Sequence, residues 1–405
     1  MIGLALRNLL RHRKRTGIAL ATISFGVIAI LLAGGFIEWI FWAMRESTIH
    51  SRLGHIQVTR PDYFQAGSAD PFAFLLPDEL LESMNLEAAP GVKVLSPRLS
   101  FTGLISYGDV TIGFIGDGVE PEKEEELSKY LRIVDGEGLD GVDQDGLLLG
   151  GGLAGNLGVT VGDTVALLAT TSSGGLNGIE GIVRGVFQSS SKEFDDAALR
   201  IPLDMARKLL RVAGAHSWVL LLSQTELTDE LLRELRLKYP ESTNRIEFTP
   251  WYSSADFYHK TVRLFSRQMD VMRLIIALII MLSISNILVM SVLERTGEIG
   301  TLMAIGFKRR SVLLLFISEG LLLGIIGGLL GVATGVVLAG VISEIGIPMP
   351  PPPGMDIGYT GEVLVTNLLV FKALLLAIST SLIGSLYPAW KSSNMEIVDA
   401  LRYNR

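Results

Sequence analysis

Residue types that carry catalysis or bind metals are scattered along this chain and form no constellation of recognised spacing. The five histidines are dispersed without an H-E-x-x-H pair, at positions 12, 50, 55, 216 and 259, whereas a zinc site needs several ligands close together. The chain has no cysteine, which excludes disulfides, thiolate metal ligands and cysteine nucleophiles. We therefore expect no catalytic residue, no metal site and a role other than that of an enzyme.

Two short segments come nearest to ligand-binding chemistry. The GGGLAG segment at 150–155 fits the G-x-G-x-x-G pattern of dinucleotide-binding turns. The residues after it return to a strand pattern instead of opening a full helix, so we favour a glycine-rich turn and short helix over a dinucleotide site. The acidic run EPEKEEE at 120–126 is interpreted as a solvated loop face, with a cation site as the minor alternative.

The sequence carries no nucleotide-hydrolysing motif. No G-x-x-x-x-G-K-[ST] segment occurs, so the chain is not expected to bind ATP through a P-loop of its own. The formal net charge of −7 argues against nucleic acid as a partner, because proteins that bind nucleic acid usually carry excess positive charge.

Composition indicates a membrane protein. Of the 405 residues, 49% are hydrophobic and only 19% are charged, and the mean hydropathy is +0.43. A helix needs about 20 apolar residues to cross the hydrocarbon core of a bilayer. Four stretches meet this requirement, at residues 17–40, 271–293, 311–343 and 368–390.

The distribution of lysine and arginine beside these spans predicts their orientation. Basic residues gather before the first span, between the second and third spans, and after the fourth, as Arg7, Arg11, Arg13, Lys14, Arg15, Arg295, Lys308, Arg309, Arg310, Lys391, Arg402 and Arg405. Since cytoplasmic loops carry an excess of positive charge, we place these three segments in the cytoplasm. The acidic region between the first two spans then lies outside it.

The exported region is expected to be a mixed α/β domain. Segments rich in β-branched residues predict strands at 55–59, 111–115, 146–149, 163–169, 179–186 and 218–222. Apolar residues at three- and four-residue spacing predict helices at 203–211 and 229–237. A similar stripe at 252–272 continues without a breaker into the second span, which predicts one helix of about 40 residues.

The third predicted span is unusually rich in glycine. Two rows repeat at four-residue spacing, Gly320, Gly324 and Gly328 in one and Gly327, Gly331 and Gly335 in the other. Small residues at this spacing allow helix backbones to approach closely, so we predict a packed interface, either within the subunit or across a dimer. Glu319 in the same span is interpreted as an interface residue or helix partner, although a charge inside a span is also a functional candidate.

Together these patterns predict an α-helical membrane protein with four transmembrane helices and a mixed α/β (α+β) domain inserted between helices 1 and 2. The predicted order is a cytoplasmic amphipathic segment, first span, exported domain with stalk helices, second span, cytoplasmic helix, third span, external loop, fourth span and cytoplasmic tail. The corresponding ranges are 1–16, 17–40, 41–270, 271–293, 294–310, 311–343, 344–367, 368–390 and 391–405.

Several segments resemble a known family. The segment ERTGEIGTLMAIGFKRR at 294–310, together with the SVLLLFISEGLLLGIIGGLLG that follows it, resembles the signature of FtsX-like permeases, the transmembrane subunits of type VII ABC transporters. In the exported region, LGHIQVTRPDYF and LLLGGGLAGNLGVTVGDTVALL are similar to pieces of the MacB-type periplasmic core domain. The resemblance implies that the exported domain is periplasmic and that the chain lies in the inner membrane.

The resemblance also implies partners and a docking segment. A permease of this kind works with two copies of a separate ATP-binding subunit and with a second permease chain, in a homodimer or a heterodimer, and it binds no cofactor itself. Residues 294–306, ending at Gly306, would form the coupling helix that docks on the ATPase. Ion pairs to the ATPase would come from Glu294, Arg295, Glu298 and Arg309, and the apolar docking face from Ile299, Leu302 and Met303.

The implied function is the transmission of ATP-driven motion to the periplasmic domain. Its substrate would be a lipoprotein or another amphipathic molecule, released or exported from the periplasmic side, with membrane lipid as an immediate neighbour. The alternative is an FtsX-like regulator that activates a periplasmic hydrolase or sensor partner and transports nothing.

Overall fold

The computed structural model describes residues 2–67, 69–129, 131–141, 145–189, 192–240, 245–350 and 359–395. The chain divides into two compact units. We call them the helical unit (Met1–Trp42, Lys260–Met349 and Tyr359–Arg405) and the α/β unit (Ala43–His259 and Pro350–Gly358). Parts of the predicted 344–367 loop and 391–405 tail, namely 351–358 and 396–405, lie outside the described residues.

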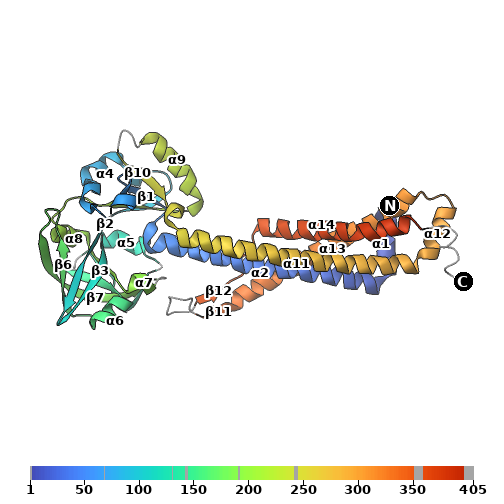
Figure 1. Ribbon diagram of the computed structural model, residues 1–405, viewed down its shortest axis with the longest axis horizontal. Coiled ribbons are helices and arrows are strands. Elements are labelled where there is room, and N and C mark those ends of the chain that lie inside the picture. The colour runs from blue at the N-terminus through green and yellow to red at the C-terminus, as the bar shows by residue number, and fades with distance from the viewer. Residues whose placement is uncertain are drawn as a thin grey trace. The chain divides into compact units, whose positions relative to one another are not determined.

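The helical unit is built from long apolar helices (Figure 1). Its helices are α1 (Ile2–Arg11), α2 (Arg13–Thr48), α11 (Asp256–Glu294), α12 (Thr296–Ala304), α13 (Arg309–Ile345) and α14 (Asn367–Ser393), and its strands are β11 (Ile347–Met349) and β12 (Tyr359–Gly361). Among the described residues, four helices are long and apolar enough to cross a membrane. All four helices extend beyond the predicted spans at both ends, because the predicted limits followed the apolar residues and each helix continues past them into polar residues.

The α/β unit contains one sheet of ten strands among the described residues. The strand order is β10-β1-β9-β2-β3-β8-β5-β7-β4, and β6 pairs with β2 and β7. The strands are β1 (Ile56–Thr59), β2 (Val92–Tyr107), β3 (Val110–Val119), β4 (Arg132–Gly136), β5 (Gly146–Gly150), β6 (Thr164–Thr170), β7 (Leu176–Gln188), β8 (Ala198–Pro202), β9 (Ser217–Leu222) and β10 (Glu247–Pro250).

Strand β2 connects the two largest hydrophobic cores that the described residues of this unit form. Its first half pairs with β9 and its second half with β3 and β6. One core lies around β1, β9 and β10, and the other lies around β3, β5, β6, β7 and β8.

Short helices and turns connect the strands of this unit. The helices are α3 (Tyr63–Ala66), α4 (Asp78–Met84), α5 (Pro121–Leu127), α6 (Gly151–Leu157), α7 (Lys192–Asp195), α8 (Leu203–Leu210) and α9 (Thr228–Lys238). The short π and 3-10 turns are η1 (Ile49–Leu53), η2 (Pro71–Phe74), η3 (Leu86–Ala88), η4 (Thr225–Leu227) and η5 (Trp251–Ser254).

In the α/β unit all six predicted strands are present, whereas β2, β4, β8 and β10 were missed. Those segments are short or contain proline and charged residues, so they lack the alternating pattern of a half-buried strand. The GGGLAG segment forms the end of β5 and the short helix α6. A Cβ on Gly152 would collide with the Asp196 carboxylate, so this turn packs against an acidic side chain that would repel a phosphate.

The acidic run at 120–126 differs from its prediction. It forms α5 instead of a loop, and its central residue, Glu124, is 7% exposed. Two arginines, Arg98 and Arg200, pair with the Glu124 carboxylate. The interpretation of the whole run as a solvated face was therefore wrong at this position, because the sequence around Glu124 does not reveal arginines that lie on distant strands.

His55, just before β1, is buried in its neutral form. Its Nδ1 accepts a hydrogen bond from the backbone N–H of Leu222, at 3.0 Å, so the ring proton is at Nε2, which lies 3.0 Å from the Thr225 hydroxyl. The pKa of His55 is lowered to about 4, mainly by burial; the electrostatic effect of His50 acts in the same direction and that of Glu46 opposes it. The folded state thus disfavours the imidazolium form.

Acidification is expected to destabilise the α/β unit through His55. The folded pKa is depressed, so this contribution is complete above the ordinary histidine pKa of 6.5 and is lost as the pH falls from 6.5 towards 4. We expect a loss of about 2 kcal/mol between pH 7.5 and 5, since one pKa unit corresponds to about 1.4 kcal/mol. Hydrogen exchange at the imidazole C2 position, followed by mass spectrometry, measures this pKa directly.

A His55→Asn variant provides the control for this prediction. The asparagine oxygen can accept from Leu222 in place of Nδ1 but does not titrate. Its thermal unfolding in detergent should therefore depend less on pH than that of the unsubstituted chain. A His55 ring that titrates near 6.5 would contradict the assignment.

Candidate functional site

Helix α12 carries four of the predicted coupling residues, and it lies at the same end of the helical unit as helix α1 (Figure 1). The helical ladder breaks at Arg295, whose φ of −103° and ψ of 14° separate α11 from α12. Helix α12 ends before Gly306, which has a φ of +108°, a conformation that side chains with a Cβ rarely adopt. The predicted helix at 294–310 is therefore corrected to Thr296–Ala304, with Glu294 in α11 and Arg309 in α13.

A buried ion pair joins α13 to the break before α12. The Arg295 Nη1 atom lies 3.2 Å from Glu319 Oε1, and these residues are 8% and 2% exposed. The same Glu319 oxygen accepts a hydrogen bond of 2.7 Å from the Asn8 side chain of α1. A buried carboxylate is costly unless it is paired and hydrogen-bonded, so Glu319 holds three elements together.

The position of Arg295 corrects its predicted role. It was expected to offer an ion pair to the ATPase, but its guanidinium is bonded inside the chain, to Glu319 and, through Nε at 3.2 Å, to Glu298. With 8% of the residue exposed, Arg295 positions α12 and does not lie on a free surface.

Two exposed ion pairs link α1 and the start of α2 to the coupling segment. Arg11 lies 3.0 Å from Glu298, and Arg15 pairs with Glu294. Burial raises the pKa of Glu298, but the hydrogen bond from Arg295 and the charge of Arg11 outweigh it, so its pKa lies below the usual value. Both glutamates predicted to face the ATPase thus already have partners within this chain.

The predicted apolar docking face points inward. Ile299 and Met303 are 4% and 8% exposed and share a hydrophobic cluster with Phe316 and Ala389, and Leu302 is half-buried. This prediction was wrong for Ile299 and Met303, because the apolar stripe of α12 packs against α13 and α14.

Two exposed apolar residues at this end follow α12 and were not predicted. Ile305 is 78% and Phe307 is 38% exposed, on either side of Gly306. Lys308, Arg309 and Arg310 are exposed beside them, and Arg309 Nη1 donates to the Asn394 side chain at 3.2 Å. The sequence signal for this surface was Gly306. A left-handed turn at a glycine ends the helix, so the residues beside it no longer follow the buried apolar face of α12.

The two glycine rows of α13 face different helices of the same chain. A Cβ on Gly320 or Gly324 would lie 2.5 or 2.8 Å from the Cβ of Ser385 or Ser381, and Gly328 faces Leu374, all three on α14. On the other side, Gly327, Gly331 and Gly335 face Ile23, Val27 and Leu31 of α2. Helix α13 is therefore held between α2 and α14 by close backbone contact.

Two protein-family models match the chain. The model of the MacB-like periplasmic core domain matches residues 16–237, and that of the FtsX-like permease C-terminal region matches residues 271–397. The first covers more than half of the chain.

Curated relatives agree with these matches. The chain is 25% identical over 338 residues to the lipoprotein-releasing system transmembrane protein LolE of Haemophilus influenzae, covering 78% of this chain and 79% of the relative. It is 28% identical over 310 residues to LolC of Xylella fastidiosa, covering 71% and 72%. The macrolide export ATP-binding/permease protein MacB of Bdellovibrio bacteriovorus is 35% identical over 125 residues, covering 30% and 17%.

The periplasmic region of MacB from Actinobacillus actinomycetemcomitans aligns with 53% of this chain and 95% of its own, at 12% identity and a TM-score of 0.38. The assignment rests on the family models, which between them match both units. This chain therefore belongs to the ABC transporter permeases of the FtsX-like family that carry a MacB-like periplasmic core domain.

Proposed function

We propose that this chain is the inner-membrane permease subunit of a complex of the Lol type, in which a separate ATPase drives release of a lipoprotein or another amphipathic molecule. Two copies of the ATP-binding subunit and a second permease chain complete the complex. The observation that carries the proposal is the end of the helical unit where buried and exposed ion pairs join α1, α12 and α13. A displacement of α12 would therefore act on spans α2, α11 and α13 together.

Relatives support lipoprotein release over drug export as the task. The matches named as lipoprotein-releasing cover 78% and 71% of this chain, whereas the named macrolide exporter matches 30% of it. No P-loop motif occurs in the sequence, which fits a chain that relies on a partner for ATP hydrolysis.

We place the ATPase on the surface formed by Ile305, Phe307 and the basic residues 308–310. This surface combines exposed apolar side chains with positive charge. Such a composition is suited to binding a groove on the ATPase that has apolar walls and an acidic rim. Glu294, Glu298 and Leu302 precede this surface in the chain. The excess of positive charge at this end supports a cytoplasmic location for it, and we assign the α/β unit to the periplasm.

Reconstitution tests this function. The chain is purified with its co-purifying ATPase, placed in proteoliposomes that hold a fluorescent triacylated lipoprotein, and supplied with ATP. We expect ATP-dependent transfer of the lipoprotein to a soluble acceptor. ATP hydrolysis without transfer, together with activation of an added periplasmic hydrolase, would overturn the proposal in favour of the regulator.

A charge swap tests whether the link between Arg15 and Glu294 takes part in coupling. Glu294→Lys places two cations together at an exposed site, where a pair contributes about 0–1 kcal/mol, so the chain should remain folded. We expect several-fold less lipoprotein release per ATP hydrolysed. The swap Arg15→Glu with Glu294→Lys should restore most of it, whereas failure of the folded swap to restore coupling would indicate that Glu294 contacts the ATPase directly.

A further inference from the structure

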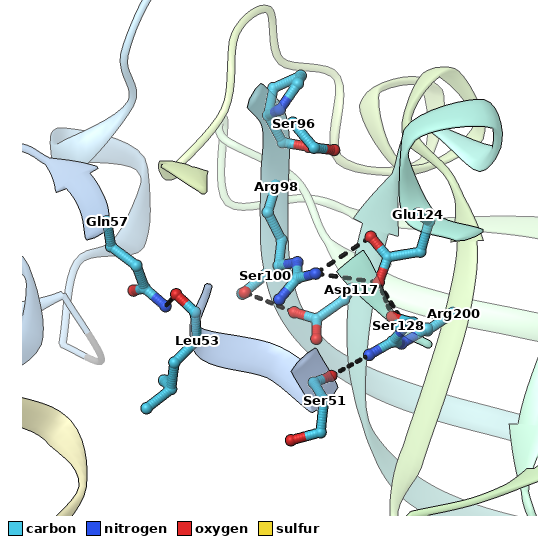
Figure 2. A network of polar contacts seen from close by, with 11 residues as sticks. Ser51, Leu53, Gln57, Ser96, Arg98, Ser100, Asp117, Glu124, Ser128 and Arg200 are labelled. Carbon is cyan, nitrogen blue, oxygen red and sulfur yellow. Dashed lines mark hydrogen bonds and ion pairs between the residues drawn. The ribbon is translucent and has the colours of Figure 1, made fainter. Parts of the chain in front are cut away.

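The first long helix ends inside the α/β unit with its carbonyl groups capped by the sheet. Helix α2 continues as the π-helical turn η1 to Leu53, and the last carbonyls of a helix lack partners within it. The Ile49 carbonyl accepts from the Gly54 N–H at 2.9 Å. The Leu53 carbonyl accepts from Gln57 of β1 at 2.9 Å, and the Ser51 carbonyl accepts from Arg200 Nη2 of β8 at 2.8 Å (Figure 2).

Arg200 belongs at the same time to a buried charged network. Its Nη1 lies 2.5 Å from both Glu124 Oε1 and the Ser128 hydroxyl, and the residue is 1% exposed. Arg98 Nη2 binds both oxygens of the same Glu124, at 3.0 and 3.1 Å. Burial alone would raise the pKa of Glu124, but the charges of Arg98 and Arg200 hold it below its usual value.

The network is balanced in charge and spans four elements. Two arginines from β2 and β8 face two carboxylates, Glu124 of α5 and Asp117 of β3, and each of the four residues is at most 7% exposed. Asp117 accepts a hydrogen bond from the Ser100 hydroxyl at 2.6 Å. Burial alone would lower the pKa of Arg98, but the charges of Glu124 and Asp117 outweigh it and raise the pKa above its usual value. A network of paired and bonded charges in a low-dielectric interior resists rearrangement.

We propose that Arg200 is the positioning residue through which movement of α2 enters the α/β unit. Its Nη2 carries a directional, charge-assisted hydrogen bond to a helix carbonyl, and a cation at a helix C-terminus also interacts favourably with the helix dipole. Its Nη1 anchors the same guanidinium in the network that joins β2, β3 and α5. This inference rests on the proposed function, because it requires ATP-driven movement of the spans.

Two charge-balanced double variants test the proposal. Arg200→Met with Glu124→Gln removes one charge of each sign and the cap on Ser51, and it leaves Arg98 opposite Asp117. The matched control, Arg98→Met with Asp117→Asn, also removes one charge of each sign but keeps Arg200, Glu124 and the cap. Neither variant buries a net charge, so both are expected to fold, which retention of the thermal transition in detergent will verify.

The readout is amide hydrogen exchange of the full chain in complex with its ATPase, with and without ATP and vanadate. In the first variant we expect exchange of the amides at 54–57 to accelerate about tenfold or more. The vanadate-dependent change in exchange of β1 and β9 should disappear while ATP hydrolysis continues. The control should keep both properties of the unsubstituted chain.

The possible results separate this inference from the function beneath it. If the unsubstituted complex shows no nucleotide-dependent change in the α/β unit, the proposed function fails and the inference fails with it. If that change is present in the unsubstituted chain and persists in the folded Arg200→Met and Glu124→Gln variant, the role of Arg200 is refuted alone. Loss of the change in both double variants would also refute it, because the effect would then belong to the network and not to the helix cap.

Discussion

Replacing Arg295 by methionine is expected to lower the free energy of unfolding of the helical unit by about 3–5 kcal/mol, the cost of leaving one member of a buried ion pair without its partner. Glu319, which is 2% exposed, would keep the hydrogen bond from Asn8 but lose the cation 3.2 Å away. The measurement is unfolding in mixed micelles of increasing denaturing detergent, followed by the signal of the helices.

A second variant separates charge from packing. Arg295→Met with Glu319→Gln removes both charges, and the glutamine oxygen can still accept from Asn8. We expect most of the lost stability to return, because an apolar replacement of a buried pair is often close to neutral. Equal stability of Arg295→Met and the unsubstituted chain would show that the pair does not hold α12 to α13.

Replacing Gly331 by leucine is expected to cost at least about 3 kcal/mol and to separate α13 from α2, since additional atoms in a packed interior displace their neighbours. A Cβ at this position would already lie 2.7 Å from Val27 Cβ, 2.9 Å from the Ser24 carbonyl and 3.0 Å from Ser24 Cα. Two of these atoms belong to the backbone of α2 and cannot rotate away.

Gly340 on the same helix provides the matched control. A Cβ at Gly340 has no neighbour within 4 Å among the described residues, and the position is exposed. Gly340→Leu adds the same side chain to the same helix and should leave stability unchanged or slightly raised, because glycine is a poor helix former. Thermal unfolding of both variants in one detergent compares them directly. A similar loss in both would mean that leucine harms α13 through its chemistry and not through contact with α2.

Local pattern predicted the helices of this protein well. The apolar stripe predicted at 252–272 has no breaker before the second span, and from Asp256 onwards it forms α11, a single helix of 39 residues; residues 252–254 belong to the 3-10 turn η5 instead. The glycine rows were legible for the same reason, because a helix places residues four positions apart on one face. The spacing did not show which helix packs against each glycine row. In this chain α14 packs against one row and α2 packs against the other.

Prediction failed where a side chain's partner lies far away in the sequence. Glu124 stands in a run of acidic residues, yet it is buried and forms ion pairs with two arginines from β2 and β8. Arg295 and Ile299 occupy a segment with the composition of a docking helix, yet both point into the helical unit.

Local sequence was enough to predict the spans, the excess of positive charge at one end and the absence of a nucleotide-binding motif, since each depends on neighbouring residues alone. Which charges are buried in pairs, which apolar side chains remain exposed and where the turn at Gly306 ends α12 became known only from the folded chain. The hydrogen bond between Asn8 and Glu319 joins residues 311 positions apart. The cost of burying that carboxylate is offset only when the folded chain brings Asn8 and Arg295 to it, and no local pattern encodes that meeting.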